Sequence, residues 1–268
     1  GTRYYNQKQD YKATIDDEKY KGNSNINEWN SQIKVTHKWN KKFYSEYEFY
    51  ATNYKTDEFL NDSNKQLFEA NFYKQWLFRP EVRTTWSFQK SKLTAGIGLN
   101  KETLNRTYFD SNVVFNSQYA FLQYDYNPTD KWNILAGFRY DNHQEYQSQW
   151  SPKFAINYKV NQNFSLKSSI GYGFKAPDFR QLYFDFSNSA IGYAVFGYNV
   201  AETKLDDLDV QGQILFRYDG IDFNSELKPE NSINFNLGSY YEKENFKWET
   251  NFFYNSISNL IDTKASAQ

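Results

Sequence analysis

The sequence contains no cysteine, no methionine, only two histidines and only five prolines in 268 residues. Without cysteine there is no disulfide bond, no thiolate metal site and no cysteine nucleophile. No apolar run approaches the ~18 residues of a transmembrane helix, so none is predicted. Lysine and arginine (31) nearly balance aspartate and glutamate (32), which leaves a net charge of -1. This balance excludes the basic excess typical of a nucleic-acid-binding protein, and we expect no nucleic-acid partner.

Signatures of enzymes are also missing. Apart from the two histidines, His37 and His143, there is no Gly-x-Ser-x-Gly elbow, no His-Glu-x-x-His pair and no glycine-rich phosphate loop. Carboxylates are abundant, but none has the apolar sequence context that would tune an acid–base pair. We therefore expect that the protein is not an enzyme and has neither a resident cofactor nor a metal site.

Aromatic residues, by contrast, are abundant: they make up 21% of the chain, with 24 tyrosines, 24 phenylalanines and 7 tryptophans. The mean hydropathy is nevertheless -0.89. A soluble core of this size would be richer in leucine, valine and isoleucine, so the rings are expected on a surface. Aromatic girdles at membrane interfaces are one such surface, because the ring is apolar and its tip is polar. A tyrosine-rich soluble β-sandwich is the alternative.

Alternation of apolar and polar residues predicts about eleven β-strands. Most are near ten residues long, which suits a tilted strand that crosses a membrane. The predicted strands are 3–14, 27–37, 43–54, 82–88, 92–104, 117–126, 132–142, 150–158, 164–173, 232–241 and 246–255. Wide loops are expected over 16–25, 55–67 and 105–116, and strand-like residues after 67 are broken by Pro80.

Short and long connections alternate strictly along these strands, as they do in outer-membrane barrels with tight periplasmic turns and longer extracellular loops. In the strand 132–142 the aromatic and aliphatic side chains alternate with polar ones. Charge is costly in lipid, so the polar set is expected in a wet lumen. The expected lipid-facing residues are Trp132, Ile134, Ala136, Phe138 and Tyr140, and the expected lumen-facing residues are Asn133, Gly137, Arg139 and Asp141. The pattern predicts an all-β fold, an antiparallel up-and-down transmembrane β-barrel.

The stretch Gly171–Tyr183 ends one strand and opens the longest loop, about 174–230. Pro177 cannot donate a ladder hydrogen bond and biases Ala176 toward an extended conformation. Asp178 is placed to cap a short helical turn that ends at Tyr183. We expect this corner to act chiefly as a conformational device, with a role in ligand uptake as the alternative.

The same stretch carries a family resemblance. Gly173–Tyr183 (GFKAPDFRQLY) resembles the "FRAP" box of TonB-dependent outer-membrane receptors, especially those for haem and siderophores. Leu227–Ser232 (LKPENS), followed by Asn234–Gly238, is similar to the start of the next barrel strand in that family. Ala136–Asp141 and Trp150–Phe154 are similar to its preceding strands. The resemblance runs from about residue 93 to 260 and covers part of such a receptor.

The resemblance implies an outer-membrane receptor that imports an iron chelate, haem or a ferric siderophore. Energy would come from a TonB-type coupling protein, acting through a plug domain and coupling box expected upstream. The chain 1–268 would form one barrel fragment, about half of a barrel of ~22 strands, because open edges are not viable in lipid. We expect it in the bacterial outer membrane, in contact with lipid. Cobalamin or another nutrient, and a passive porin or adhesin barrel, are the alternatives.

Candidate site residues follow from the two motifs and from the oxygen and nitrogen donors near them. The motif residues are Phe174, Lys175, Ala176, Pro177, Asp178 and Arg180 in the first box and Leu227, Lys228, Pro229 and Glu230 in the second. Haem receptors typically carry arginine where this chain has Lys175, and often a histidine between their boxes, where residues 175–230 contain none. The candidate ligand-binding residues are therefore Tyr183, Tyr193, Tyr198 and His143.

Five aspartates of the long loop form a separate acidic cluster. They are Asp206, Asp207, Asp209, Asp219 and Asp222. Carboxylate oxygens suit Ca²⁺, but the spacing does not match an EF-hand loop. We expect a solvated acidic loop here.

Overall fold

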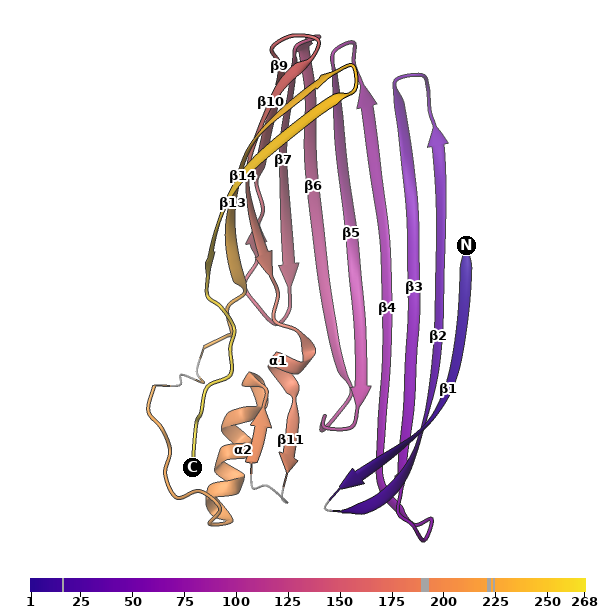
Figure 1. The fold of residues 1–268 in the computed structure, drawn as a ribbon, viewed down its shortest axis with the longest axis vertical. Coiled ribbons are helices and arrows are strands. Elements are labelled where there is room, and N and C mark those ends of the chain that lie inside the picture. The colour runs from indigo at the N-terminus through magenta and orange to yellow at the C-terminus, as the bar shows by residue number, and fades with distance from the viewer. Residues whose placement is uncertain (16, 189–192, 221–222, 224) are drawn as a thin grey trace.

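The computed structural model describes residues 1–15, 17–188, 193–220, 223 and 225–268. Most of this chain forms one twelve-stranded antiparallel sheet in which each strand lies beside the next along the sequence (Figure 1). Its long strands are β1 (Thr2–Ile15), β2 (Glu18–Lys38), β3 (Phe43–Asn61), β4 (Leu67–Ser87), β5 (Ser91–Arg106), β6 (Val113–Thr129), β7 (Trp132–His143), β9 (Lys153–Lys159), β10 (Phe164–Lys175), β13 (Glu230–Lys243) and β14 (Phe246–Ser258). The two-residue β8 (Gln149–Trp150) pairs with β7.

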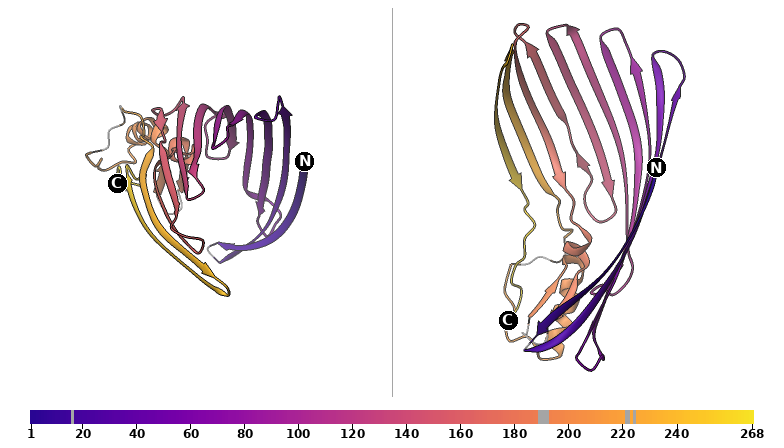
Figure 2. Two further views of the ribbon diagram at one scale, coloured as in Figure 1. Left: turned by 90° about the horizontal axis from the view of Figure 1, so that it is seen from above. Right: turned by 45° about the vertical axis from the view of Figure 1, so that its right-hand side comes forward.

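The sheet is curved and open, with β1 and β14 at its edges (Figure 2). The predicted all-β, up-and-down fold and the eleven-strand path are thus confirmed, in the form of a partial barrel. A β-sandwich is excluded because the strands form one continuous large sheet rather than two packed layers. The turns after β2, β4, β6, β9 and β13 are tight and lie at one end, here called the short-turn end. The wider connections lie at the other, the long-loop end, where β1 and β2 nevertheless stay paired up to Ile15↔Glu18.

Two predicted loops are largely strand. β1 and β2 stay paired from Thr2↔Ser31 to Ile15↔Glu18, so the described part of the expected loop 16–25 is mostly ladder. β3 and β4 likewise pair up to Asn61↔Leu67, which leaves a turn of only 62–66 where 55–67 was expected as loop. Polar residues occupy both faces of these extensions, so an alternation of apolar with polar residues could not reveal them.

The predicted break at Pro80 is also wrong, because β4 continues through it. Its ladder with β3 includes Phe49↔Pro80. The ladder with β5 omits Arg79 and Pro80 and resumes at Glu81↔Gly98. Proline lacks a backbone N–H, so a strand can accommodate it where the hydrogen bonding to one neighbour is interrupted.

The two faces of the sheet differ in character. We call the face that carries Leu104 and Phe115 the inner face, and the opposite one the outer face. In β7 the outer-face Phe138 is 41% exposed and the inner-face Asp141 only 9%. Exposed apolar side chains recur on the outer face at the same level of neighbouring strands, including Ile33, Val35, Phe49, Phe78, Ile97, Leu122, Phe154, Ile170, Phe235 and Phe252. The chain therefore presents an apolar band outward.

Several charged side chains of the inner face, in β3, β4 and β7, are paired with one another. Arg83 lies 2.7 Å from Glu81 and 3.3 Å from Glu48. Arg139 contacts Asp141 at 2.6 Å, and its guanidinium lies 3.9 Å from the ring centre of Tyr119. Such pairing compensates the cost of placing these charges on the inner face, where they are only partly exposed to solvent.

The segment between β10 and β13, residues 176–229, is called the excursion. It contains the helices α1 (Phe179–Tyr183) and α2 (Tyr198–Val210) and the hairpin of β11 (Asp185–Asn188) and β12 (Tyr193–Phe196). Figure 1 shows it at the long-loop end. Neither helix of the described chain is long and apolar enough to cross a membrane. The sequence predicted the turn that became α1 but not α2.

Candidate ligand-binding site

The first motif turns the chain onto the inner face of the sheet. Asp178 caps α1 as predicted: its Oδ1 accepts a hydrogen bond from the N–H of Gln181 at 2.8 Å, and the Gln181 side chain accepts one from the N–H of Asp178 at 2.9 Å. This reciprocal arrangement is a capping box. A five-residue helix cannot persist by hydrogen bonding alone, so tertiary packing must hold it.

That packing comes from an apolar cluster between the excursion and the sheet. Leu182 is 0% exposed, and Phe179 stacks on Phe115 of β6 at 3.9 Å between ring centres. Leu104 of β5 completes the buried set, and Leu227 of the second motif packs against it. Pro177 and Pro229 are fully buried. The rigid corner thus positions Phe179 and Leu182, three residues apart, to cover the inner face.

The two motifs meet at the long-loop end of the sheet, where β10 ends and β13 begins. Lys175 and Glu230 are direct partners in the β10–β13 ladder, and their side chains form a 3.0 Å ion pair. Glu230 also accepts a hydrogen bond from the N–H of Ile261 at 3.2 Å. Since Lys175 is largely solvated, the pair contributes little to stability and mainly marks the junction. Phe174 is half-buried 6.5 Å from Tyr146, Ala176 is half-buried, and Lys228 is exposed.

Two of the predicted ligand residues converge on Glu145. Tyr183 donates a hydrogen bond to Glu145 Oε2 at 2.5 Å, and His143 Nδ1 accepts one from the N–H of Glu145 at 3.1 Å. The His143 ring also stacks on Tyr146 at 4.1 Å. Burial, followed by the bond to Glu145, raises the pKa of Tyr183 to about 12. These side chains are engaged in holding the excursion against the loop that follows β7.

The other two predicted ligand residues are placed differently. Tyr198 packs against the apolar cluster, and its hydroxyl lies 3.4 Å from Ser225 Oγ. Tyr193 lies in β12, is 48% exposed and contacts Phe186 at 5.8 Å between ring centres. The structure therefore brings Tyr183, Tyr198 and His143 around one cluster and leaves Tyr193 outside it.

The acidic cluster of the excursion is not organised around an ion. Asp206 and Asp209 form ion pairs with Arg217 at 2.8 Å and 3.3 Å. Asp222 lies outside the described residues. Within the described ranges no group of three or more histidine or acidic side chains could hold a metal ion.

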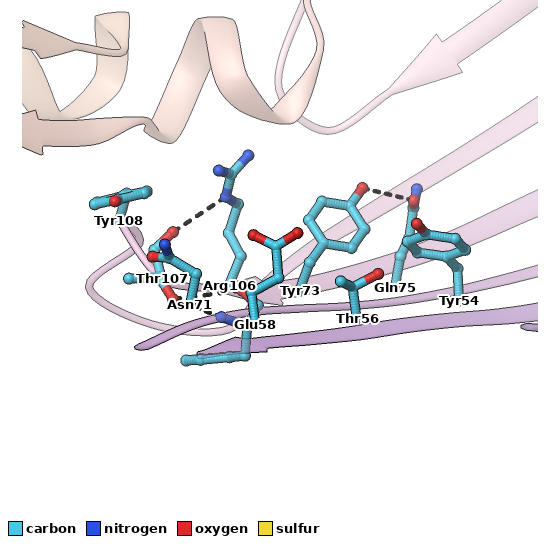
Figure 3. A pocket seen from close by; sticks show the side chains of 10 residues that line it. Tyr54, Thr56, Glu58, Asn71, Tyr73, Gln75, Arg106, Thr107 and Tyr108 are labelled. Atoms are coloured by element: carbon cyan, nitrogen blue, oxygen red, sulfur yellow. Dashed lines mark hydrogen bonds between the residues drawn. The ribbon is translucent and has the colours of Figure 1, made fainter. Parts of the chain in front are cut away.

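A cavity of about 600 Å³ lies beside this region, on the inner face at the long-loop end (Figure 3). It is lined by Tyr54, Thr56, Glu58, Asn71, Phe72, Tyr73, Gln75, Arg106, Thr107 and Tyr108. None of the residues predicted from the motifs is in this lining. The side chains come from β3, β4 and the end of β5; Thr56, Glu58 and Arg106–Tyr108 lie where the sequence predicted loop, and the others lie where it predicted a strand or strand-like residues.

Arg106 is the only cation in the lining of this cavity. The centre of its guanidinium lies within 6 Å of four ring centres: Phe184 at 5.4 Å, Tyr73 at 5.7 Å, Tyr108 at 5.8 Å and Phe109 at 5.9 Å. Its Nε donates to the carbonyl of Thr107 at 3.1 Å. Within the described chain Arg106 forms no ion pair with a carboxylate, so its charge is held by ring faces and stays available to a ligand.

Phe184 carries a second cation. The guanidinium of Arg180, a residue of the first motif, lies 4.9 Å from its ring centre. Two arginines thus share one ring between the excursion and the cavity, and Glu58 is the one carboxylate among the described residues of the lining. Tyr108 donates a hydrogen bond to Glu69 at 3.1 Å, and burial together with Glu69 raises the pKa of its phenol. The region between the cavity and the excursion therefore combines guanidinium groups with flat aromatic surface.

Comparison with known proteins identifies the protein family to which this open sheet and its excursion belong. Residues 1–268 match the family described as TonB dependent receptor-like, beta-barrel. The chain therefore belongs to the TonB-dependent receptor β-barrel family, and the resemblance predicted from the motifs is confirmed.

Relatives within the family bear different names. The chain is 26% identical over 184 residues, 69% of its length, to the probable TonB-dependent siderophore receptor PirA of Acinetobacter baumannii, of which it covers 22%. It is 23% identical over 208 residues, 78% of its length, to the vitamin B12 transporter BtuB of Vibrio cholerae, of which it covers 27%. The chain thus spans about a quarter of the length of these curated relatives.

A solved structure gives the same fold. The ferric enterobactin receptor PfeA of Pseudomonas aeruginosa aligns with a TM-score of 0.64 at 13% identity, over 96% of this chain and 42% of that one. At this identity the likeness concerns the fold alone. The named relatives are receptors and transporters rather than enzymes, in agreement with the expectation from the sequence.

Proposed function

We propose that the protein is part of a bacterial outer-membrane receptor that binds an iron chelate and imports it with energy from a TonB-type partner. The observation that carries this proposal is the cavity at the long-loop end, where Arg106 is surrounded by aromatic rings and has no acidic ion-pair partner among the described residues. Ferric chelates with anionic, often aromatic, iron-binding groups complement such a surface in charge and shape. The family and the name of the siderophore-receptor relative support the same class of cargo.

Among iron chelates the site favours a ferric siderophore over haem. Binding of haem through His143 or Tyr183 would require these side chains to leave their contacts with Glu145 and Tyr146. Neither of them lines the cavity. A ferric siderophore brings its own complete set of iron ligands and needs only charge and aromatic contacts from the protein.

Cobalamin is the second candidate cargo, because one relative is named a vitamin B12 transporter. Nothing in the cavity favours it specifically: an arginine without a carboxylate partner is of most use to an anionic ligand. A passive porin or adhesin barrel is less consistent with membership of a family of TonB-dependent receptors.

The proposal is tested on the full-length receptor, purified in detergent and titrated with a ferric tris-catecholate, haemin and cyanocobalamin in parallel. Binding is followed by quenching of tryptophan fluorescence for all three ligands and by the Soret band for haemin. We expect saturable binding of the ferric catecholate with an affinity well above that for the other two. Saturable binding of cyanocobalamin alone would move the protein to the cobalamin branch and contradict an iron-chelate cargo.

Energy coupling is tested separately in cells that produce the full-length receptor. Uptake of the radiolabelled ferric chelate is expected to stop when the proton gradient is dissipated, while binding at the cell surface persists. Uptake that continues at the same rate without the gradient would indicate a passive pore.

A further inference from the structure

The cavity at the long-loop end contains an acidic group that the iron-binding end of a chelate does not use. Glu58 of β3 lines this cavity and is half-buried. Within the described chain its carboxylate forms no hydrogen bond and no ion pair. A partly buried carboxylate without a partner carries a desolvation cost, which a cation or a set of N–H donors would relieve.

Arg106 of β5 does not neutralise Glu58, because strand β4 lies between them. Glu58 is opposite Asn71 of β4, whereas Arg106 is opposite Tyr73, so the two charges are two strands and one side-chain level apart. A strand spacing of ~4.8 Å and a two-residue rise of ~6.8 Å place their Cα atoms about 12 Å apart. Figure 3 shows both side chains on the same side of the strands, toward the excursion. The cavity therefore has a positive end and a negative end.

Two buried oxygen atoms at the negative end also lack a partner. They are Thr56 Oγ1 and Asn71 Oδ1, neither of which has a hydrogen-bond partner among the described residues. Thr56 lies two residues before Glu58 on the same face of β3, and Asn71 is the direct cross-strand partner of Glu58. Asn71 Nδ2 donates to Glu69 at 2.9 Å, which leaves Oδ1 as its free acceptor. Buried polar atoms without partners are uncommon, so this group indicates a ligand that brings hydrogen-bond donors.

The three side chains together complement a primary ammonium group. Glu58 supplies a negative charge, and Thr56 and Asn71 each supply a further acceptor oxygen at the same end of the cavity. An ammonium group has one positive charge, three N–H donors and no acceptor. A catecholate or carboxylate group placed here would instead meet a like charge at Glu58.

We propose that Glu58, Asn71 and Thr56 bind a protonated amine carried by the ferric chelate, while Arg106 binds its anionic iron-binding end. This inference rests on the proposed iron-chelate cargo and narrows it to chelates that bear an ammonium arm. The two ends of the cavity set the orientation of the ligand, because each repels the group that the other attracts. Glu58 thereby discriminates between chelates that share the same iron-binding groups.

The experiment compares two synthetic ferric tris-catecholates on the full-length receptor in detergent. One carries an aminopropyl arm, and the other carries the same arm with its amine acetylated, so that they differ in charge and donors but not in their iron-binding groups. Quenching of tryptophan fluorescence measures both affinities. We expect the wild type to bind the amine-bearing chelate about tenfold or more tightly than the acetylated one, as for a hydrogen-bonded contact between charged groups.

Variants assign this preference to the negative end of the cavity. Glu58→Gln should abolish it by weakening binding of the amine-bearing chelate, without weakening binding of the acetylated one. Thr56→Val keeps the shape but removes the hydroxyl, and should reduce the preference only in part. Asp57→Asn is the matched control, because this carboxylate is the next residue of β3 but lies on the outer face, paired with Lys55 at 2.6 Å. It should leave the preference unchanged.

Two results would overturn the proposal: equal affinity of the wild type for the two chelates, or a preference that survives in the Glu58→Gln variant. Saturable binding of both chelates with equal affinity would leave the iron-chelate cargo in place. Absence of saturable binding of either chelate would instead contradict the cargo itself. Arg106→Gln separates the two ends, because it should weaken binding of both chelates by the same factor and preserve the preference.

Discussion

At the scale of single residues, the two arginines around Phe184 determine which ligands the cavity at the long-loop end can bind. Arg106 and Arg180 approach one ring from the sheet and from the excursion, with the ring centre 5.4 Å and 4.9 Å from their guanidinium groups. Contact with ring faces holds a guanidinium in place without neutralising it. A charge that is fixed but not neutralised is suited to recognition rather than to folding.

Replacing Arg106 by glutamine is therefore expected to weaken binding of an anionic ferric chelate by about five- to thirtyfold, which corresponds to about 1–2 kcal/mol for a desolvated cation contact. Arg106→Lys should recover only part of the affinity, because an ammonium keeps the charge but loses the planar stacking. Fluorescence titration of the full-length receptor provides the measurement. If the glutamine variant binds as tightly as the wild type, the ligand does not contact this cavity.

Burial of the Tyr183 phenol, together with its hydrogen bond to Glu145, makes the excursion sensitive to alkaline pH. Burial, more than the bond itself, raises the phenol pKa from its ordinary value of 10 to about 12. The folded state therefore binds the proton more tightly, so this contribution to stability is complete below pH 10 and is lost as the pH rises through 12. The protection of the α1 amides, taken relative to their base-catalysed intrinsic exchange, should fall across this window.

The Tyr183→Phe variant supplies the control. It lacks the titrating phenol, so the part of the pH dependence that belongs to Tyr183 should disappear, while Tyr146, whose pKa burial also raises, keeps its own contribution. An identical pH profile in the variant and the wild type would assign the effect to other groups.

At the scale of elements, the excursion depends on the buried face of α1 more than on its cap. Leu182→Ala should destabilise the packed excursion by about 2–5 kcal/mol, because it removes a fully buried side chain and leaves a cavity. Asp178→Ala should cost about 1 kcal/mol through the lost cap. Limited proteolysis of the full-length receptor within 176–229 measures both effects. We expect the Leu182→Ala variant to be cleaved fastest, the Asp178→Ala variant more slowly and the wild type most slowly.

The same substitution at an exposed leucine of the excursion is the matched control. Leu215 is 90% exposed, so Leu215→Ala should leave the cleavage rate unchanged. Equal rates for the Leu182 and Leu215 variants would mean that α1 does not anchor the excursion to the sheet.

The elements also show which parts of the fold the sequence could predict. In β7 the apolar side chains alternate with Arg139 and Asp141, so both the strand and its faces were predicted from periodicity. In β3 the residues Lys55–Asn61 carry polar groups on both faces, and period two gave no signal for a strand. Cross-strand pairing with β2 and β4 holds that extension, which is information that no local pattern contains.

The candidate site was hidden for the same reason. Tyr54, Tyr73 and Arg106 lie on three different strands and meet only because the registers align them. The sequence placed Tyr54 at the edge of the expected loop 55–67 and Arg106 inside the expected loop 105–116. The motif around Pro177 was found because its residues are contiguous in the chain, and its capping role was confirmed because capping is a local property.

At the scale of the whole molecule, the two edges of the sheet decide how the chain behaves alone. β1 and β14 each lack a partner on one side, and no neighbouring strand of the described chain covers them. Unpaired N–H and C=O groups are very costly in hydrocarbon, so a sheet with open edges is not stable there. Residues 1–268 produced without the rest of the protein are therefore not expected to insert into lipid vesicles as a monomer.

The full-length receptor, refolded into the same vesicles, should show β-rich circular dichroism and slower migration after heating than before it in cold gel electrophoresis, as a closed barrel does. The chain 1–268 should instead aggregate or associate through its edges, β1 of one copy against β14 of another, since both edges offer long antiparallel ladders. Cross-linking in vesicles distinguishes these states. A heat-modifiable, uncross-linked monomer of residues 1–268 would show that the edges close on each other, and the half-barrel would then have to be redrawn as a small barrel complete in itself.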